Sequence, residues 1–158
     1  METNVITLPL FHVVGYRIEA SVEEFESGLG KNAYLSLLER KDEIANKKND
    51  HVILMQIYPI DPDFNPQVDS FINIVCYEVS EQGKVPSEMI SHTVNESKYV
   101  KGTHKGLESE LSSSYDYLYG QWMEETGHEP KHYDFEIWDE RYQPESTDNE
   151  IDLFIALA

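Results

Sequence analysis

Side chains that can do chemistry alternate along one short stretch near the C-terminus. Every second position holds one of them: His132, Asp134, Glu136 and Trp138. Successive side chains of a β-strand point to opposite faces, so a strand over 132–138 would gather these four on one face. The other face would carry Tyr133, Phe135 and Ile137 toward the core. A carboxylate beside an indole fits the floor of a binding cavity, and it fits a surface glutamate next to a partly covered tryptophan equally well.

Metal binding is disfavoured by the spacing of the nearby polar residues. His128 and His132 are four residues apart, but Gly127 and Pro130 prevent the helix that would put both on one face. Along a strand, His132 and Glu136 are roughly 13 Å apart, which is too far for one ion. We therefore predict no metal site.

Motifs for nucleophilic catalysis or phosphate binding are missing. The run Ser112-Ser113-Ser114 lacks the Gly-x-Ser-x-Gly surroundings of a hydrolase serine. Cys76 lies in an apolar run, where a thiol usually behaves as a small hydrophobe. Gly28 and Gly30 do not continue into a phosphate loop. We expect no cofactor.

The charge balance limits the classes of partner. The chain carries 30 acidic and 12 basic side chains, a formal net charge of -18. Phosphate backbones and anionic membranes would be repelled, so we expect no direct nucleic-acid binding and no membrane binding. The acidity fits a cationic ligand or a basic protein partner, and it equally fits a chain kept in solution by its charge. With one cysteine, no visible signal peptide and no long apolar run, we expect a cytoplasmic protein.

The elements that must position these side chains occur in the same order in both halves. Apolar patterning in the first half predicts a strand over 4–19, a helix over 32–45, and strands over 51–58 and 71–79. Ser21 and Glu24 have the spacing of a capping box, which marks a helix start.

The second half follows after the polar segment 80–87. It should contain a strand over 89–104 with a bend at 95–97, a helix over 107–126 that Gly127 ends, and strands over 132–138 and 151–157. We predict an α+β fold of two duplicated strand-helix-strand-strand halves, about 1–80 and 88–158. Their strands would merge into one largely antiparallel sheet with two main helices.

Aromatic side chains are spread over both halves: Tyr58, Tyr77, Tyr99, Tyr115, Tyr119, Trp122 and Trp138. For any single one, a place in the core is the simpler explanation. Several of them converging with one carboxylate on a concave surface would form a cage for an aromatic or cationic ligand. Glu136 would then be poorly solvated, which raises its pKa unless a cation or a hydrogen-bond donor compensates.

Spaced motifs in this chain resemble the GyrI-like small-molecule-binding family. In the second half they are Tyr99-Val-Lys-Gly-Thr-His104-Lys-Gly106, Tyr117-Leu-Tyr119-Gly-Gln-Trp122, Gly127-His128 and Phe135-Glu136-Ile-Trp138. In the first half, Val14-Gly15-Tyr16-Arg17 and Cys76-Tyr77-Glu78-Val79 resemble family strands. The family includes effector-binding domains of bacterial transcription activators and the DNA gyrase inhibitor protein. The chain departs from it at Cys76, usually Gly, at Tyr34, often Trp, and at Trp138, often Tyr.

The resemblance implies one effector-binding domain over 1–158, without a DNA-binding domain, whose two halves meet at a central ligand cleft. It also implies that Glu136 is the pocket glutamate, with Tyr99 and Trp122 among its aromatic neighbours. The residues predicted to bind the ligand are Glu136, Trp138, Trp122, Tyr99, Tyr77, Tyr58, Tyr119 and Tyr34.

Three functions remain open from the sequence. The first is a stand-alone protein that binds a lipophilic drug or toxin, cationic or not, as a multidrug sensor or sequestering accessory of transcription in bacteria. The second is a hydrolase that opens strained, cyclopropane-bearing electrophiles, in which Glu136 activates water and Tyr99 donates a proton. The third is a gyrase-inhibitor-like interaction, in which the acidic surface docks on gyrase or a transcription regulator. A monomer and a homodimer are both compatible with the sequence.

Overall fold

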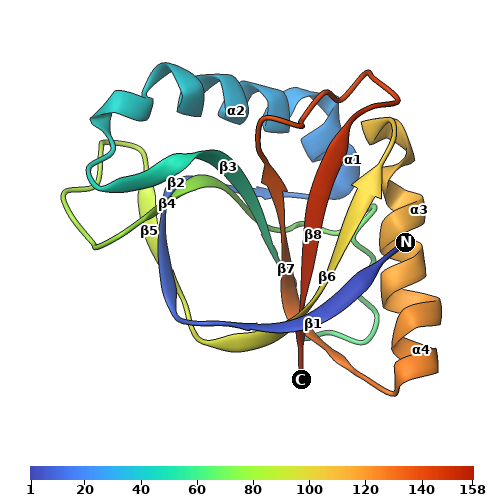
Figure 1. Cartoon of the computed structure of the whole chain (residues 1–158). Coiled ribbons are helices and arrows are strands. Elements are labelled where there is room, and N and C mark those ends of the chain that lie inside the picture. Colours follow the sequence, from blue (N-terminus) through green and yellow to red (C-terminus); the bar gives the residue numbers. More distant parts are fainter.

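Each half of the chain folds in the predicted order of strand, helix, strand and strand, as the computed structural model of residues 1–158 shows (Figure 1). The first half contains β2 (Phe11–Ala20), α1 (Val22–Glu24), α2 (Gly30–Glu39), β3 (Lys47–Ile57) and β4 (Phe71–Val79). The second contains β6 (Ser97–Lys105), α3 (Leu111–Asp116), α4 (Met123–Thr126), β7 (Pro130–Trp138) and β8 (Glu150–Leu157). The α+β class and the duplicated order are thereby confirmed.

Two further strands exchange between the halves. The stretch predicted as one strand over 4–19 is two strands, β1 (Thr3–Leu8) and β2, because Pro9 lacks the N–H that pairing requires. β1 pairs with β6 of the second half, and β5 (Ile90–Val94) pairs with β2 of the first half. All eight strands form one antiparallel sheet in the order β1-β6-β8-β7-β3-β4-β2-β5.

The first helical segment begins earlier and ends earlier than predicted. The capping box is present, with Ser21 Oγ accepting from the backbone N–H of Glu24, and it starts α1. The helical path continues through a π-helical segment, Phe25–Leu29, in which Gly28 has φ 140°, a value that only glycine adopts easily. α2 then ends at Glu39, since Lys41–Glu43 form a separate 3-10 turn and Ile44 is extended. β3 begins earlier than the predicted strand 51–58, because the polar residues 47–50 belong to it.

The second helical segment agrees with the predicted range 107–126. It consists of a 3-10 turn (Glu108–Glu110), α3, a π-helical segment (Tyr117–Trp122) and α4. Gly127 ends it with φ 72°, as predicted. No helix in the structure combines the length and the apolar character needed to cross a membrane.

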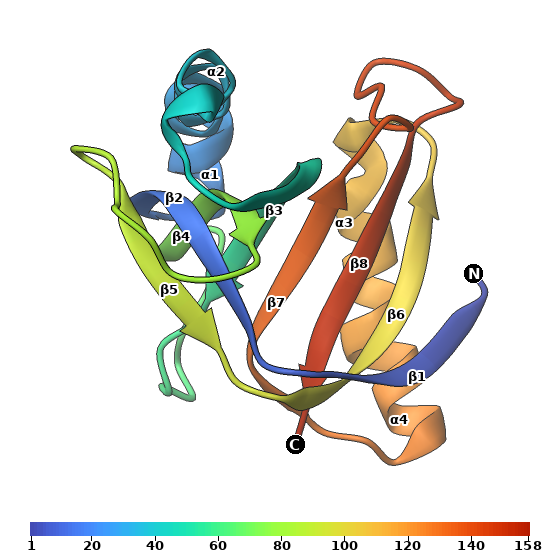
Figure 2. The same cartoon turned by 60° about the vertical axis from the view of Figure 1, so that its left-hand side comes forward.

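The sheet buries both of its faces. On one face, the helices cover a core that includes Leu37 of α2, Leu118 of the π-helical segment and Leu153 of β8. On the opposite face, the sheet curls around a second core (Figure 2). In this core, Phe11 of β2 contacts Phe135 of β7 with ring centroids 5.6 Å apart. The curl therefore closes a face that no helix covers.

The central strands are buried on both sides. In β3, the adjacent residues Val52 and Ile53 belong to different cores. β7 pairs with β3 and joins the two halves. Its predicted polar face is buried as well, since Asp134 and Glu136 are 0% and 2% exposed. Buried carboxylates at the junction of the halves need compensating contacts, and these define the candidate site.

Candidate functional site

A cavity of about 680 Å³ lies over the junction of β3 and β7, and we call it the central cavity. Its floor comes from β3, β4 and β7, and its walls come from α1, α3 and the β3–β4 loop. Floor side chains include Leu54, Gln56 and Glu136, and the α3 side contributes Tyr115 and Tyr119. The cavity therefore lies between the helical segments of the two halves.

Glu136 lines the central cavity with its carboxylate held by two donors. Tyr115 donates its hydroxyl proton to Oε2 at 2.6 Å, and Trp138 donates its indole N–H to Oε1 at 3.0 Å. Directly across the β7–β3 pair, Glu136 faces Leu54, so apolar packing surrounds the carboxylate. Neither donor is charged, and Glu136 forms no ion pair in the structure.

Asp134 is a second buried carboxylate on the same face of β7. Its Oδ2 accepts hydroxyl protons from Tyr58 at 2.8 Å and from Tyr119 at 2.6 Å. Its Oδ1 is buried and has no hydrogen-bond partner. Both tyrosines line the central cavity. Asp134 is not itself a lining residue, but it is hydrogen-bonded to these two. The unpartnered oxygen is a buried acceptor that a cationic neighbour would stabilise.

The secondary structure explains why these groups meet. Tyr115 and Tyr119 are four residues apart in one helical segment, and side chains at that spacing share a face. Their rings stack with centroids 6.3 Å apart. β7 presents Asp134 and Glu136 two residues apart on the face that this helix covers. Each tyrosine therefore reaches one carboxylate.

Burial dominates the electrostatics of the pair. It raises the pKa of Asp134 to about 7, against the hydrogen bonds from Tyr119 and Tyr58 that lower it. It raises the pKa of Glu136 to about 7 as well, against the hydrogen bonds from Tyr115 and Trp138. Burial also holds the pKa of the Tyr58, Tyr115 and Tyr119 phenols well above the usual value, so these groups stay neutral donors. The site can therefore exchange protons near neutral pH while its donors remain fixed.

The structure brings together five of the eight predicted ligand-binding residues. Glu136, Tyr58 and Tyr119 line the central cavity. Trp138 and Tyr34 line an adjoining recess, with ring centroids 5.3 Å apart. Trp138 connects the two spaces through its hydrogen bond to Glu136.

The other three predicted residues lie elsewhere. Trp122 belongs to the core under the helices, where it stacks on His128 and donates to Thr3. Tyr77 is fully buried in the same core, with its hydroxyl unpartnered. Tyr99 belongs to the core on the opposite face of the sheet, where its hydroxyl pairs with that of Tyr133. Tyr99 is therefore not placed to act together with Glu136.

Three groups that shape the site were not among the predicted ligand-binding residues: Asp134, Gln56 and Tyr115. Asp134 shares the strand face of Glu136, so alternation alone pointed to it. Tyr115 was among the aromatic side chains considered for a cage, and its spacing of four residues from Tyr119 pointed to a shared helix face. Gln56 Oε1 accepts from the Tyr115 hydroxyl at 3.2 Å, a contact that no local pattern predicts. No group of three or more His, Cys, Asp and Glu side chains is arranged to hold a metal ion.

Comparisons with known proteins identify a relative of this chain and structures that share its fold. The chain is 30% identical over 162 residues to the transcriptional regulator BrlR of Pseudomonas aeruginosa, covering 99% of this chain and 56% of BrlR. Its fold is similar to that of SAV2435 bound to tetraphenylphosphonium, with a TM-score of 0.74 and 12% identity over 100% of this chain and 94% of that one.

Two further structures share the fold. EcmrR, solved in a complex with DNA, has a TM-score of 0.77 and 16% identity over 99% of this chain and 57% of that one. A hydrolase from Listeria innocua has a TM-score of 0.58 and 12% identity over 99% of this chain and 92% of that one. The chain thus spans little more than half the length of BrlR and EcmrR.

Residues 4–157 match the Cass2 family, described as integron-associated effector binding protein. The match covers nearly the whole chain, and the fold agrees with it. The chain therefore belongs to the Cass2 family of GyrI-like effector-binding domains.

Proposed function

We propose that this protein binds a lipophilic aromatic cation in the central cavity and serves as a sensor or sequestering protein for such compounds. The observation that carries the proposal is the pair of buried carboxylates, Asp134 and Glu136, which have neutral donors and no cationic partner. A bound cation would supply the missing charge in a poorly solvated place, where electrostatic attraction is strong.

The walls of the cavity suit an aromatic ligand. Tyr58, Phe64 and Phe71 form a cluster with ring centroids 5.0 to 6.0 Å apart. The stacked rings of Tyr115 and Tyr119 lie on the α3 side. Aromatic faces attract cations and pack against flat apolar groups. The basic side chain that lines the cavity, Lys131, donates to Ser97 at 2.7 Å and forms no ion pair with the carboxylates.

The related proteins support the same ligand class. SAV2435 was solved with tetraphenylphosphonium, a lipophilic aromatic cation, and BrlR is a transcriptional regulator. This chain would bind a compound of that class. Binding would either signal the presence of the compound to a partner protein or sequester the compound.

Calorimetry with tetraphenylphosphonium tests the proposal. Glu136→Gln keeps the size and shape of the side chain and one acceptor oxygen, and it removes the charge, so the affinity at pH 8 should fall at least roughly tenfold. Trp122→Phe, a core change away from the cavity, is the control and should leave the affinity within about twofold. Equal affinities for the wild type and Glu136→Gln would sink the proposal.

The contact between Tyr115 and Glu136 also favours a second candidate, hydrolysis of a strained electrophilic ring, and the Listeria fold relative is a hydrolase. Glu136 would take a proton from water as the water oxygen bonds to the ring carbon. The ring C–C bond would break, and its electrons would pass to a conjugated carbonyl as an enolate, which a tyrosine would protonate. Tyr115 replaces Tyr99 as the donor in this scheme, since Tyr99 lies on the other face.

Incubation with a cyclopropane-bearing electrophile separates the two candidates. A hydrolase would release ring-opened product faster than the Glu136→Gln and Tyr115→Phe variants do. Release by the wild type no faster than by Glu136→Gln would exclude hydrolysis at this site, and release no faster than by Tyr115→Phe would exclude Tyr115 as the proton donor.

A further inference from the structure

A row of polar side chains crosses three neighbouring strands at the floor of the central cavity. Asp134 of β7 lies directly opposite Gln56 of β3, and Gln56 lies directly opposite Asn73 of β4. Opposite residues of an antiparallel pair point to the same face, with Cβ atoms roughly 5 Å apart. We call these three residues the polar row. All three are buried, and Gln56 and Asn73 line the cavity.

The polar row has more hydrogen-bond acceptors than donors to satisfy them. Oε1 of Gln56, in the middle, accepts from Tyr115 at 3.2 Å and from Tyr58 at 3.4 Å. At the two ends of the row, Oδ1 of Asn73 and Oδ1 of Asp134 are buried without a hydrogen-bond partner. A buried acceptor that has lost its bonds to water and gained no others destabilises the folded chain, and folded proteins contain few such atoms. A ligand that brings a donor would remove this cost.

The amide of Asn73 is held in one orientation by the backbone around it. Its Nδ2 donates to the carbonyls of Ala20 and Phe71, each at 3.2 Å, and to that of Ile18 at 3.4 Å. An amide oxygen in the same place would face three other acceptors, so the nitrogen belongs there. The oxygen is therefore the unpartnered end of a fixed side chain, in a residue that is 0% exposed and lines the cavity.

Asn73 and Glu136 stand at opposite ends of the cavity floor. Their strands are separated by β3, and Glu136 faces Leu54, which is two residues along β3 from the polar row. From the spacing of strands and the rise along a strand, the two Cα atoms are roughly 12 Å apart. Between them lies the apolar side chain of Leu54, and beside Asn73 lies the ring of Phe71. The cavity thus has a carboxylate at one end and a neutral acceptor at the other.

We propose that Asn73 is a second, uncharged anchor of the central cavity, which accepts a hydrogen bond from an N–H or O–H group of the ligand. The inference rests on the proposed function and narrows its ligand class to aromatic cations that also carry a neutral donor. An ion contact of about 4 Å at Glu136 and a hydrogen bond of about 3 Å at Asn73 leave roughly 5 Å between charge and donor. That is about the length of one para-substituted aromatic ring.

The sign of a ligand preference reports whether the acceptor is used. An amino group on the ligand loses its bonds to water when it enters the cavity, and only an acceptor at its end offsets that loss. A methyl group of similar size has no such bonds to lose, and its burial is favourable. Without the Asn73 acceptor, a methyl-substituted cation would therefore bind more tightly than its amino counterpart. With the acceptor, the order is reversed.

Calorimetry with two substituted phosphonium ions tests the inference, with the full chain at pH 8. The compounds are (4-aminophenyl)triphenylphosphonium and (4-methylphenyl)triphenylphosphonium, which have the same charge and nearly the same size. The wild type should bind the amino compound about tenfold more tightly. Asn73→Leu keeps a similar volume and offers no acceptor, so it should bind the methyl compound more tightly. Tyr99→Phe, on the opposite face of the sheet, is the control and should keep the wild-type preference.

The outcomes separate this inference from the proposed function. A wild type that prefers the methyl compound would overturn donor recognition, and the proposed function would stand if Glu136→Gln still weakens both compounds. A preference for the amino compound that survives in Asn73→Leu would overturn the role of Asn73. Absence of binding by both compounds would overturn the proposed function and the inference with it. If Asn73→Leu does not fold, Asn73→Val makes the same comparison with a residue that strands favour.

Discussion

The hydroxyl of Tyr115 lies 2.6 Å from Oε2 of Glu136, and this contact joins the helix of the second half to the strand that connects the halves. The two residues are 21 positions apart in sequence, and Glu136 has no cationic partner in the structure. Glu136 thus has a fixed neutral donor on one side and the open cavity on the other. A cation entering the cavity would meet a carboxylate that is already oriented.

Tyr115→Phe should weaken cation binding at pH 7 severalfold. Loss of the phenol removes a hydrogen bond that lowers the pKa of Glu136, so more of the carboxyl is protonated and uncharged. The defect should shrink at pH 9, where the carboxyl is ionised in both proteins. Affinity measured across this pH range checks the effect. Tyr99→Phe, on the other face of the sheet, is the matched control and should leave affinity unchanged.

The affinity for a cation should rise with pH and level off above about pH 8. Asp134 and Glu136 both have a pKa of about 7 in the free protein, and only their ionised forms attract the ligand. Between pH 6 and 8 the ligand therefore displaces protons as it binds. Calorimetry in buffers of different ionisation enthalpy measures that release directly. A flat profile from pH 6 to 8 would show that neither carboxyl is coupled to the ligand.

The free protein should lose stability as pH rises from about 5 to 8. The two carboxyls have a pKa near 4 when unfolded and about 7 when folded, so in this range the folded chain holds protons that the unfolded chain has released. The free energy of unfolding must then fall with pH, by about 1.4 kcal/mol for each unit of pKa shift. Urea unfolding at several pH values checks this. The double variant Asp134→Asn and Glu136→Gln should flatten the dependence.

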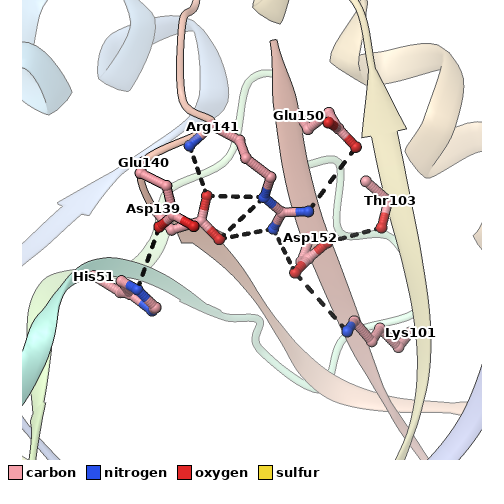
Figure 3. Close-up of polar contacts among 8 residues, drawn as sticks. All are labelled: His51, Lys101, Thr103, Asp139, Glu140, Arg141, Glu150 and Asp152. Atoms are coloured by element: carbon pink, nitrogen blue, oxygen red, sulfur yellow. Dashed lines mark hydrogen bonds and ion pairs between the residues drawn. The ribbon is translucent and has the colours of Figure 1, made fainter.

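Arg141→Ala should destabilise the β7–β8 loop by about 1–2 kcal/mol, because Asp139 and Asp152 lose their charged donor (Figure 3). Tyr142, which follows Arg141 in the same loop, should become more mobile. Arg17→Ala removes an exposed pair with Glu19 and should cost close to nothing. Denaturant unfolding of the two variants compares them. Equal stabilities would mean that the loop does not depend on Arg141.

Much of the fold follows from local patterns in the sequence. Alternation over 151–157 predicted β8, the Ser21–Glu24 spacing marked the helix start, and Gly127 marked the helix end. The exchange of β1 and β5 between the halves was not predicted, since pairing of distant strands depends on tertiary contacts. Pro9 divides the stretch that was predicted as one strand, and a proline alone does not indicate which strand each part pairs with.

The candidate site was only partly predictable for a related reason. A strand pattern tells which residues share a face, and it names Asp134 together with Glu136. Tyr99 and Val100 are adjacent and both buried, so nothing local decides which of them faces the helices, and a shift of one residue exchanges the faces. The partners Tyr58, Tyr115 and Tyr119 come from other elements and reach the carboxylates only after the halves pack together.

Charge discrimination at the central cavity tests the account most directly. The measurement compares the affinities of tetraphenylphosphonium and the neutral triphenylphosphine oxide at pH 8, in the wild type and in Glu136→Gln. At the site sensitive to residue 136, the wild type should prefer the cation at least roughly tenfold, and the variant should lose most of that preference. Equal binding of the cation and the neutral compound by the wild type would contradict cation recognition by the buried carboxylates.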